Sequence, residues 1–259
     1  MEKIAFQSYF DYIHFAKECV CGKVYPLSIA EGYQQGDIFV KSGVDCNTVL
    51  FWHYSGFAFI AGAYDESFLG AVYEQFIEKN TDNRRFVLFS DGKCIADYFC
   101  RKANTDTERR YFFEYRNENR DIHYKVPHHY ELREIDVELL SKMEGRITPY
   151  FSWDCSEAFL EKGKGYCLIS GDDIAAWAFS AAVSDGEIDI GVEVCEKYRH
   201  RGLATVVAKA MIQYILSANK VPVWACHCQN IASAALAGKL GFIKTGECSV
   251  IKRREPQHD

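Results

Sequence analysis

The chain has 259 residues, of which 48% are hydrophobic and 25% charged, and its formal net charge is -6 at pH 7. These values exclude a disordered or collagen-like chain, and the length suffices for one large or two smaller domains without disulfides or a structural metal. The acidic excess is divided evenly between the two halves, so neither half has the concentrated basic surface that nucleic-acid binding needs. We therefore expect no nucleic-acid partner.

The cysteines and the N-terminal residues indicate a compartment. Eleven cysteines are an odd number, and they lack the spacing of a small disulfide-linked scaffold. We interpret them as reduced thiols in a cytoplasmic protein. The first residues contain no continuous apolar region followed by a small-residue cleavage site, and no apolar run reaches the ~18 residues that span a bilayer. No membrane partner is expected.

The first half predicts a helix, a hairpin, a second helix and two strands, at residues 4–19, 48–64, 68–77, 85–89 and 110–115. The charged segment Glu118–Pro127 is the expected boundary, which gives a smaller N-terminal α/β domain over residues 1–126 and a second domain over residues 127–259. No sequence repeat of constant period links the halves. The element order of the first half is still compatible with a degenerate copy of the second, and its role is left open.

The second half predicts an α/β order of elements. Residues 187–194 alternate strictly between polar and apolar, which is typical of a strand with one buried face. After Gly202, apolar residues recur at the i, i+3, i+4 spacing of an amphipathic helix. The other expected strands are at residues 130–135, 165–169, 174–180 and 221–226, and a final extended segment is at 242–252. Helices are expected at 137–143, in a stretch that ends at Leu160, and from Asn230 to Gly241.

The turn between strand 187–194 and the following helix is the strongest local signal. A helix N-terminus exposes unpaired N–H groups and a partial positive charge, so it attracts an anion. The run Arg199-His200-Arg201-Gly202-Leu203-Ala204 places two small residues at the helix entrance and adds two cationic side chains. The spacing predicts a pyrophosphate site. The plain alternative is that Gly202 only permits close helix packing and that both arginines are surface charges.

This turn is accompanied by Val192-x-Val194 before it and by Asn230-x-x-Ser233 and Lys239-Leu240-Gly241-Phe242 after it. Together these residues resemble the acyl-CoA-binding core of the GNAT N-acetyltransferase superfamily, over roughly residues 128–252. The two-part length is similar to that of a subgroup that includes an antibiotic self-resistance acetyltransferase. The resemblance implies an α/β (α+β) chain whose C-terminal GNAT fold has a central mixed, mostly antiparallel sheet flanked by helices.

The resemblance also implies an activity, the transfer of an acetyl group from acetyl-CoA, as co-substrate, to a primary amine of a small molecule by direct attack. The backbone of Val192 and Val194 would pair with the pantetheine amides, and the Val194 N–H would stabilise the developing oxyanion. No metal is expected. The residues expected to hold acetyl-CoA are Val192, Val194, Arg199, His200, Arg201, Gly202, Leu203, Ala204, Thr205, Asn230 and Ser233.

An alkyl amine near pKa ~10 arrives protonated, so the reaction needs a base. The acids on strand 187–194 are Glu187, Asp189 and Glu193, which share one face unless a bulge intervenes. We favour Glu193 and leave the other two open. Many relatives in the superfamily have a tyrosine acid at the position of Ala237, and its absence keeps open a second hypothesis, a catalytically weak or inactive CoA-binding regulatory or interaction module.

Other candidate residues favour plain interpretations. The triplet Cys226-His227-Cys228 lacks the C-x-x-C spacing that tetrahedral zinc sites prefer. Trp153, Trp177 and Trp224 are interpreted as core or cleft-wall aromatics. Neither the amine substrate nor the oligomeric state follows from the sequence.

Overall fold

The computed structural model describes residues 1–41, 47–80, 84–90, 92–116 and 122–254. The chain forms two compact units. The first contains Met1–Phe112, His227–Gln229 and the residues from Gly246 onward, and the second contains Phe113–Cys226 and Asn230–Thr245. The expected boundary segment Glu118–Pro127 lies partly outside the described residues, and the limit between residues 126 and 127 stays a prediction.

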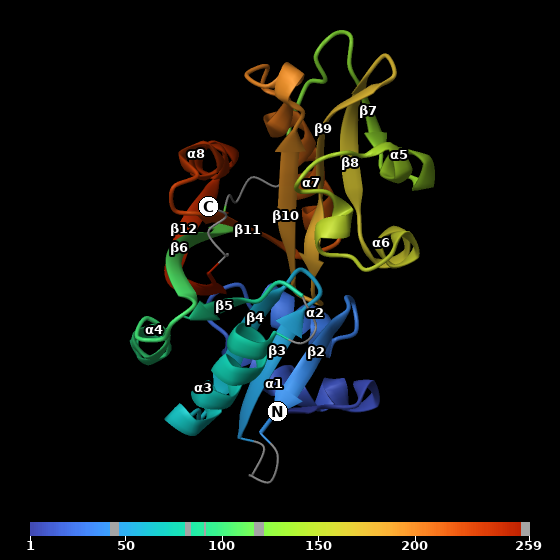
Figure 1. Cartoon of the computed structure of the whole chain (residues 1–259). Coiled ribbons are helices and arrows are strands. Elements are labelled where there is room, and N and C mark those ends of the chain that lie inside the picture. The colour runs from blue at the N-terminus through green and yellow to red at the C-terminus, as the bar shows by residue number, and fades with distance from the viewer. Residues whose placement is uncertain (42–46, 81–83, 91, 117–121, 255–259) are drawn as a thin grey trace. The chain divides into compact units, whose positions relative to one another are not determined.

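The first unit is a mixed sheet with helices on both faces (Figure 1). Its strands follow the order β1-β2-β3-β4-β5-β12-β6, in which β1 to β4 are antiparallel and β4 and β5 are parallel. The elements are β1 (Glu2–Lys3), the 3-10 helix η1 (Phe6–Tyr12), α1 (Ile13–Glu18), α2 (Val24–Ala30), β2 (Gly36–Val40), β3 (Thr48–His53), β4 (Phe57–Gly62), α3 (Glu66–Val72), its π-helical continuation η2 (Tyr73–Lys79), β5 (Val87–Ser90), α4 (Lys93–Phe99) and β6 (Thr105–Tyr115).

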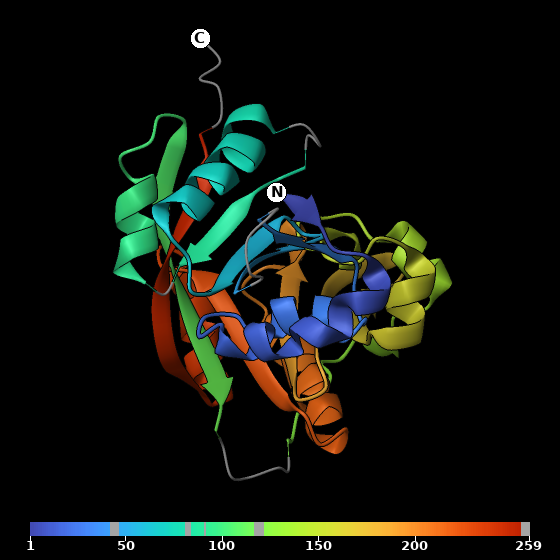
Figure 2. The ribbon, with the colours of Figure 1, turned by 90° about the horizontal axis from the view of Figure 1, so that it is seen from below.

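The apolar residues of this unit pack on both sides of its sheet. On one face, Trp52 and Leu88 pack with apolar residues of α3, η2 and α4 in a single buried cluster. On the other face, the ring of Tyr25 on α2 contacts the rings of Phe57 and Phe59 on β4. Figure 2 shows α1–α2 and α3 on opposite sides of these strands. Burial on both faces explains why β3 to β5 are apolar runs without alternation.

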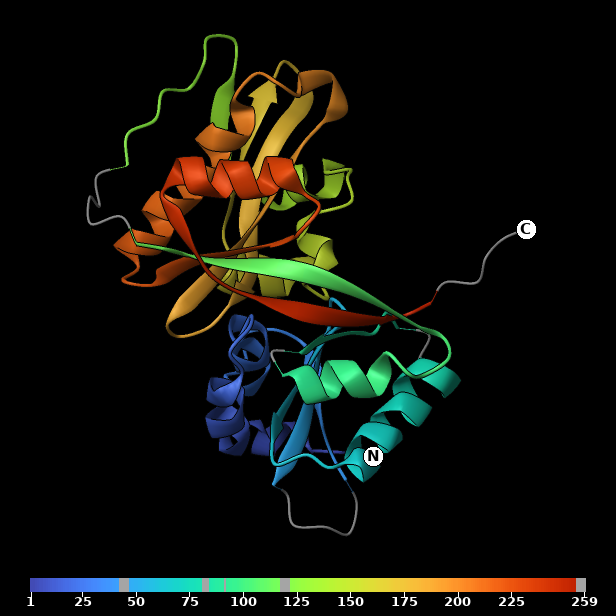
Figure 3. The same ribbon diagram turned by 90° about the vertical axis from the view of Figure 1, so that its left-hand side faces the viewer.

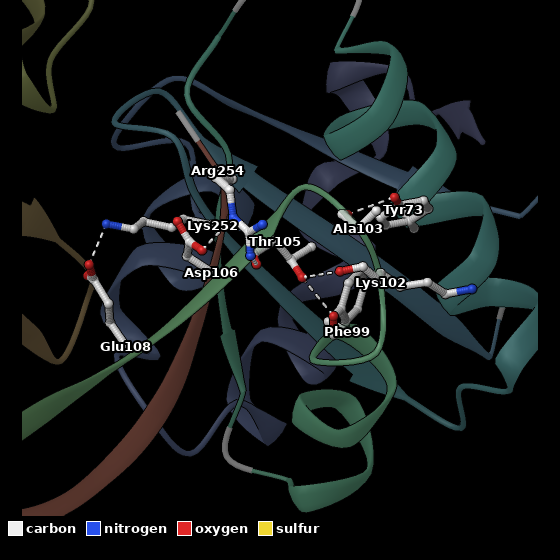
Figure 4. Close-up of polar contacts among 9 residues, drawn as sticks. All are labelled: Tyr73, Phe99, Lys102, Ala103, Thr105, Asp106, Glu108, Lys252 and Arg254. Carbon is white, nitrogen blue, oxygen red and sulfur yellow. Dashed lines mark hydrogen bonds and ion pairs between the residues drawn. The ribbon is translucent and has the colours of Figure 1, made fainter. Parts of the chain in front are cut away.

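Strands β6 and β12 (Phe242–Arg253) run side by side (Figure 3). In the first unit, charged residues connect them: Arg254 Nε lies 2.9 Å from Asp106 Oδ1, and Lys252 pairs with Glu108 (Figure 4). The Thr105 hydroxyl donates to the carbonyl of Phe99 at 2.8 Å and so joins the start of β6 to the end of α4. Opposite charges on neighbouring strands favour their pairing.

The second unit is a mixed, mostly antiparallel sheet in the order β6-β11-β10-β9-β8-β7, in which β10 and β11 are parallel. Helix α7 packs against β8, β9 and β10. The elements are β7 (Glu131–Glu134), α5 (Val137–Lys142), the 3-10 helix η3 (Pro149–Phe151), α6 (Ser156–Lys162), β8 (Gly165–Ser170), β9 (Asp173–Val183), β10 (Glu187–Val194), the 3-10 turn η4 (Glu196–Tyr198), α7 (Leu203–Ser217), β11 (Val221–His227) and α8 (Ile231–Leu240).

The two halves have the same order of elements. Each reads strand, helical segments, three strands, helix, strand, helix and long final strand, ending at β6 in the first half and at β12 in the second. The final strand of the second half pairs with β5 of the first unit, with Ser249 opposite Ser90. The expected α/β (α+β) class, and the expectation that the first half is a degenerate copy of the second, are confirmed at the level of topology.

The sequence predicted the second half more closely than the first. Strand 187–194 is β10, and the helix after Gly202 is α7. In the first half, the single helix expected over residues 4–19 is instead η1 followed by α1, and α2, β2 and α4 were not predicted. All seven residues of α2 are buried, so this helix has no polar face and no amphipathic period. Within the described ranges, no helix is long and apolar enough to cross a membrane.

Candidate active site

The candidate site begins where β10 loses one of its two neighbours. In the part of the chain that the structure describes, β10 pairs with β11 at Glu187, Ile188 and Asp189, whereas its pairing with β9 continues to Val194 opposite Ala176. The edge of β10 that would face β11 is therefore open from Ile190 to Val194. Unpaired strand edges present N–H and C=O groups that an extended ligand can pair with.

Backbone hydrogen bonds show which residues face this open edge. The carbonyl of Gly186 accepts from the Val221 N–H on β11, and the Cys195 N–H donates to the Ala175 carbonyl on β9. Backbone groups along a strand alternate in direction, so the even-numbered residues point toward β11. The N–H and C=O groups of Val192 and Val194 therefore point to the open edge, and their predicted contacts with an extended ligand stay a prediction.

A bulge does occur, and it lies on β9. Asp189 pairs with Ala182 and Ile190 pairs with Ser180, so the extra residue is Ala181. The alternation along β10 is thus uninterrupted. Glu187 and Asp189 lie in the segment paired with β11, and Glu193 is the acid that lies beside the open edge.

The turn from β10 into α7 leaves the start of the helix free of a capping side chain. Gly202 is the N-cap residue with φ 76°, and none of the described side chains caps the helix. His200 also has a positive φ of 63°. The Thr205 N–H turns back onto the Gly202 carbonyl at 3.1 Å. In a helix of 15 residues, the first amides and the dipole make this end a site for an anion.

Side chains hold the shape of this turn. The Arg201 guanidinium lies 5.3 Å from the centre of the Tyr198 ring and donates to the Tyr130 hydroxyl at 3.3 Å. The Tyr198 hydroxyl and Lys197 Nζ each lie 2.7 Å from Asp173 Oδ2, and their hydrogen bonds lower the pKa of Asp173. The structure thus places Arg201 as a brace of the turn, a position that the sequence did not reveal.

Arg199 is exposed, and its guanidinium lies 3.8 Å from the Glu196 carboxylate. So long and exposed a pair contributes little to stability. The start of α7 therefore presents main-chain amides, and Arg199 lies close to them in the sequence. His200, Leu203, Ala204 and Thr205 contribute backbone to the same turn, and their predicted role in holding acetyl-CoA stays a prediction.

Asn230 and Ser233 lie together at the start of α8. The Asn230 Oδ1 accepts from the Ser233 N–H at 3.1 Å, which confirms the predicted cap. The Trp224 indole donates to the Ser233 hydroxyl at 3.0 Å. The side chain of Ala237 is a fully buried methyl group, and a methyl group is not a proton donor.

Glu193 is held by a loop that sequence reasoning missed. Its carboxylate accepts from the amides of Arg146 at 3.3 Å and Ile147 at 2.5 Å. The indole of Trp177, which lies opposite Glu193 on β9, donates to the Ile147 carbonyl at 2.7 Å. A contact between residues so far apart in sequence leaves no local pattern, so no signal in the sequence indicated it.

Cys195, which follows β10 directly, is not an activated thiol. Cys195 Sγ lies 3.0 Å from the Ile174 carbonyl, and burial raises the pKa of its thiol. His227 Nε2 lies 3.2 Å from Glu108 Oε2, and its Nδ1 accepts from the Gln229 N–H. Among the residues that the structure describes, no group of three His, Cys, Asp or Glu side chains is placed to hold a metal ion.

In the second unit, the parallel strands β10 and β11 separate just before the uncapped N-terminus of α7. This arrangement in a mixed sheet defines the class of the protein, because it is the GNAT fold. A family model described as GNAT acetyltransferase matches residues 22–251, which is most of the chain. The chain belongs to the GNAT acetyltransferase family. The match extends well into the first unit, where the sequence motifs had given no resemblance.

Individual relatives agree with this assignment. The chain is 27% identical over 204 residues to the protein named uncharacterized N-acetyltransferase YdfB of Bacillus subtilis (strain 168), covering 76% of this chain and 77% of the relative. A GCN5-related N-acetyltransferase-like protein from Streptococcus suis 89/1591 has a TM-score of 0.73 at 19% identity, covering 96% of this chain and all of that one. A tandem GNAT protein from the clavulanic acid biosynthesis pathway has a TM-score of 0.61 at 12% identity, covering 98% of both chains. The two structures show the shared two-part fold.

Proposed function

We propose that this chain is an acetyl-CoA-dependent N-acetyltransferase that acetylates a primary amine of a small molecule by direct attack. The observation that carries the proposal is the open edge of β10, which leads directly to the uncapped N-terminus of α7. The edge supplies N–H and C=O groups for an extended amide-containing arm, and the helix start supplies amides for a diphosphate. Acetyl-CoA contains both groups in this order.

The other predicted residues take the following roles in the proposal. The backbone of Val192 and Val194 pairs with the pantetheine amides, and Asn230 and Ser233 lie along that arm. The amides of the α7 turn and its cationic side chains surround the pyrophosphate, through Arg199, His200, Arg201, Gly202, Leu203, Ala204 and Thr205. Val192, Val194 and the residues of the turn lie in one strand-turn-helix segment, which supports their assignment.

In the proposed mechanism, Glu193 takes a proton from the incoming ammonium group, directly or through water. The free amine then forms the C–N bond at the thioester carbonyl carbon. The Val194 N–H, which points to the open edge, stabilises the developing oxyanion. The attacking nitrogen loses its second proton to solvent and the C–S bond breaks, which leaves the neutral amide. The CoA thiolate takes a proton from solvent, because the methyl side chain of Ala237 offers none.

A second function is favoured by the buried Ala237, namely a CoA-binding module with weak or no turnover. Two measurements distinguish the hypotheses: thermal stabilisation by acetyl-CoA, and release of free CoA thiol from acetyl-CoA across a panel of small amines. We expect stabilisation together with thiol release. Stabilisation without release would favour the module, and the absence of stabilisation would contradict both hypotheses.

The base is tested by Glu193→Gln. We expect kcat/KM for the amine to fall about 100-fold, with the largest loss at low pH, because the ammonium form then predominates. The measurement is the pH profile of kcat/KM for both proteins. Glu187→Gln provides the comparison, because Glu187 lies on the same strand in the segment paired with β11. A larger fall of kcat/KM in Glu187→Gln than in Glu193→Gln would contradict the assignment of Glu193 as the base.

A further inference from the structure

The loop between α5 and η3 is held to the sheet at the proposed catalytic carboxylate. Two successive amides, those of Arg146 and Ile147, donate to the two oxygens of Glu193. Each oxygen keeps a lone pair, so the carboxylate can still accept a proton or a hydrogen bond from an ammonium group. The loop therefore fixes the orientation of Glu193 without blocking it.

Trp177 fixes the same loop from the neighbouring strand. It pairs with Glu193 across β9 and β10, and its indole N–H donates to the Ile147 carbonyl at 2.7 Å. The Trp177 side chain is 1% exposed and Ile147 is half-buried, so a Trp177 N–H that lost this acceptor would be left without a water partner. Ile147 is thus held through its N–H by one strand and through its carbonyl by the next.

Gly145 permits this close approach. A Cβ at this position would lie 2.6 Å from Trp177 Cζ2 and 2.8 Å from Glu193 Oε2. Contacts this short do not occur in folded proteins, so any other residue would push the loop away from both side chains. The fit of the loop thus depends on three positions: Gly145, Trp177 and Glu193.

We infer that Trp177 is a positioning residue, which holds the Gly145–Ile147 loop on Glu193 and thereby fixes the orientation of the Glu193 carboxylate. The inference rests on the proposed function for its catalytic consequence. Misplacement of a catalytic group by about 1 Å can cost about 100-fold in rate. Because the loop contacts both oxygens of Glu193, Glu193→Gln changes two properties of the site. It removes the base, and it presents one acceptor and one donor to two amide N–H groups.

Trp177→Phe tests the inference, because it keeps an aromatic ring and removes the N–H. Trp153→Phe is the matched control: Trp153 is equally buried and donates to the backbone carbonyl of Ser180 at 2.8 Å in the same unit. We expect kcat/KM for the amine to fall at least tenfold in Trp177→Phe and less than twofold in Trp153→Phe. The Kd for acetyl-CoA should stay within twofold in both, because the open edge and the helix turn are unchanged.

Hydrogen exchange of the Ile147 amide provides a readout that needs no activity. We expect Trp177→Phe to accelerate this exchange strongly and Trp153→Phe to leave it unchanged. Gly145→Ala should reproduce the effects of Trp177→Phe, whereas Gly186→Ala should not, because no described atom lies within 4 Å of a Cβ at Gly186.

Equal losses of kcat/KM in Trp177→Phe and Trp153→Phe, or an Ile147 amide that stays protected in Trp177→Phe, would overturn the inference. The failure of the proposed function is a different result. If the wild-type chain releases no CoA thiol with any amine, the catalytic role falls with the proposed function, and the Ile147 exchange rates still decide whether Trp177 holds the loop.

Discussion

The two halves share an order of elements and differ at the corresponding turn between strand and helix. In the second unit, β10 leads to Gly202 and then to α7, whose first turn contains no acidic residue. In the first unit, β4 leads to Asp65, whose carboxylate accepts from the Phe68 N–H at 2.7 Å, and Glu66 follows in the first turn of α3. One helix start is open to an anion, and the other is already occupied by one.

The fold alone therefore does not leave a helix start open to a diphosphate. Both turns have the same place in the topology, yet a carboxylate at the N-cap satisfies the helix amides and repels a second anion. The helices differ in length as well, since α7 has 15 residues and α3 has seven before its π-helical continuation. We therefore expect each chain to bind one acetyl-CoA, through its second unit.

The largest expected effect comes from Gly202→Val. A Cβ at this position meets no described atom within 4 Å, so the protein has room for the side chain, but that side chain would occupy the approach to the helix amides. We expect acetyl-CoA affinity to fall about 100-fold, measured by isothermal titration calorimetry. The wild-type stoichiometry should be one per chain.

Because Gly202 has a positive φ, a valine at this position also lowers the unfolding free energy by about 1–2 kcal/mol. Gly32→Val is the control, because Gly32 has φ 75° and likewise no described atom within 4 Å of a Cβ. Its stability should fall by a similar amount while its affinity for acetyl-CoA stays unchanged. An unchanged affinity in Gly202→Val would contradict the proposed diphosphate site, and two sites per wild-type chain would contradict the comparison of the halves.

The next prediction concerns the loss of stability at acid pH that His53 causes in the first unit. His53 is fully buried, and burial, with a smaller contribution from the charge of Arg84, lowers its pKa to about 3 from 6.5. Its Nδ1 accepts from the Ser55 N–H at 3.1 Å, so the folded state holds the neutral ring. Below pH 6.5 the unfolded chain takes up a proton that the folded chain does not, and stability is lost as the pH falls toward 3.

At pH 5 this loss amounts to about 2 kcal/mol. His53→Gln keeps an acceptor for Ser55 and removes the titration, so its unfolding free energy should depend less on pH between 6.5 and 4. Urea unfolding at several pH values measures this. His128→Gln, at an exposed position, should retain the wild-type dependence. Equal pH dependence in His53→Gln and the wild type would show that His53 does not cause the acid sensitivity.

The sequence predicted the strand-turn-helix segment because its signals are local. Alternation along β10, Gly202 and the apolar spacing of α7 lie within about thirty residues, and the structure confirms these elements. The open edge of β10, the brace formed by Arg201 and the loop on Glu193 depend on contacts between distant residues, and no local pattern encodes them. The topology of the first unit was hard to predict for a different reason: burial on both faces removes the polar and apolar period from its strands and from α2.

The smallest expected effects come from the two capping side chains, Asp65 on α3 and Asn230 on α8. Alanine at either position removes one hydrogen bond to a helix amide and should cost about 1 kcal/mol of unfolding free energy. Their consequences for the ligand should differ, because only Asn230 is placed along the proposed pantetheine arm. We expect Asn230→Ala to weaken acetyl-CoA binding several-fold and Asp65→Ala to leave it unchanged, measured by titration calorimetry beside urea unfolding. If both variants bind acetyl-CoA as tightly as the wild type, Asn230 is only a helix cap and does not contact the pantetheine arm. That result would not contradict the proposed diphosphate site at Gly202.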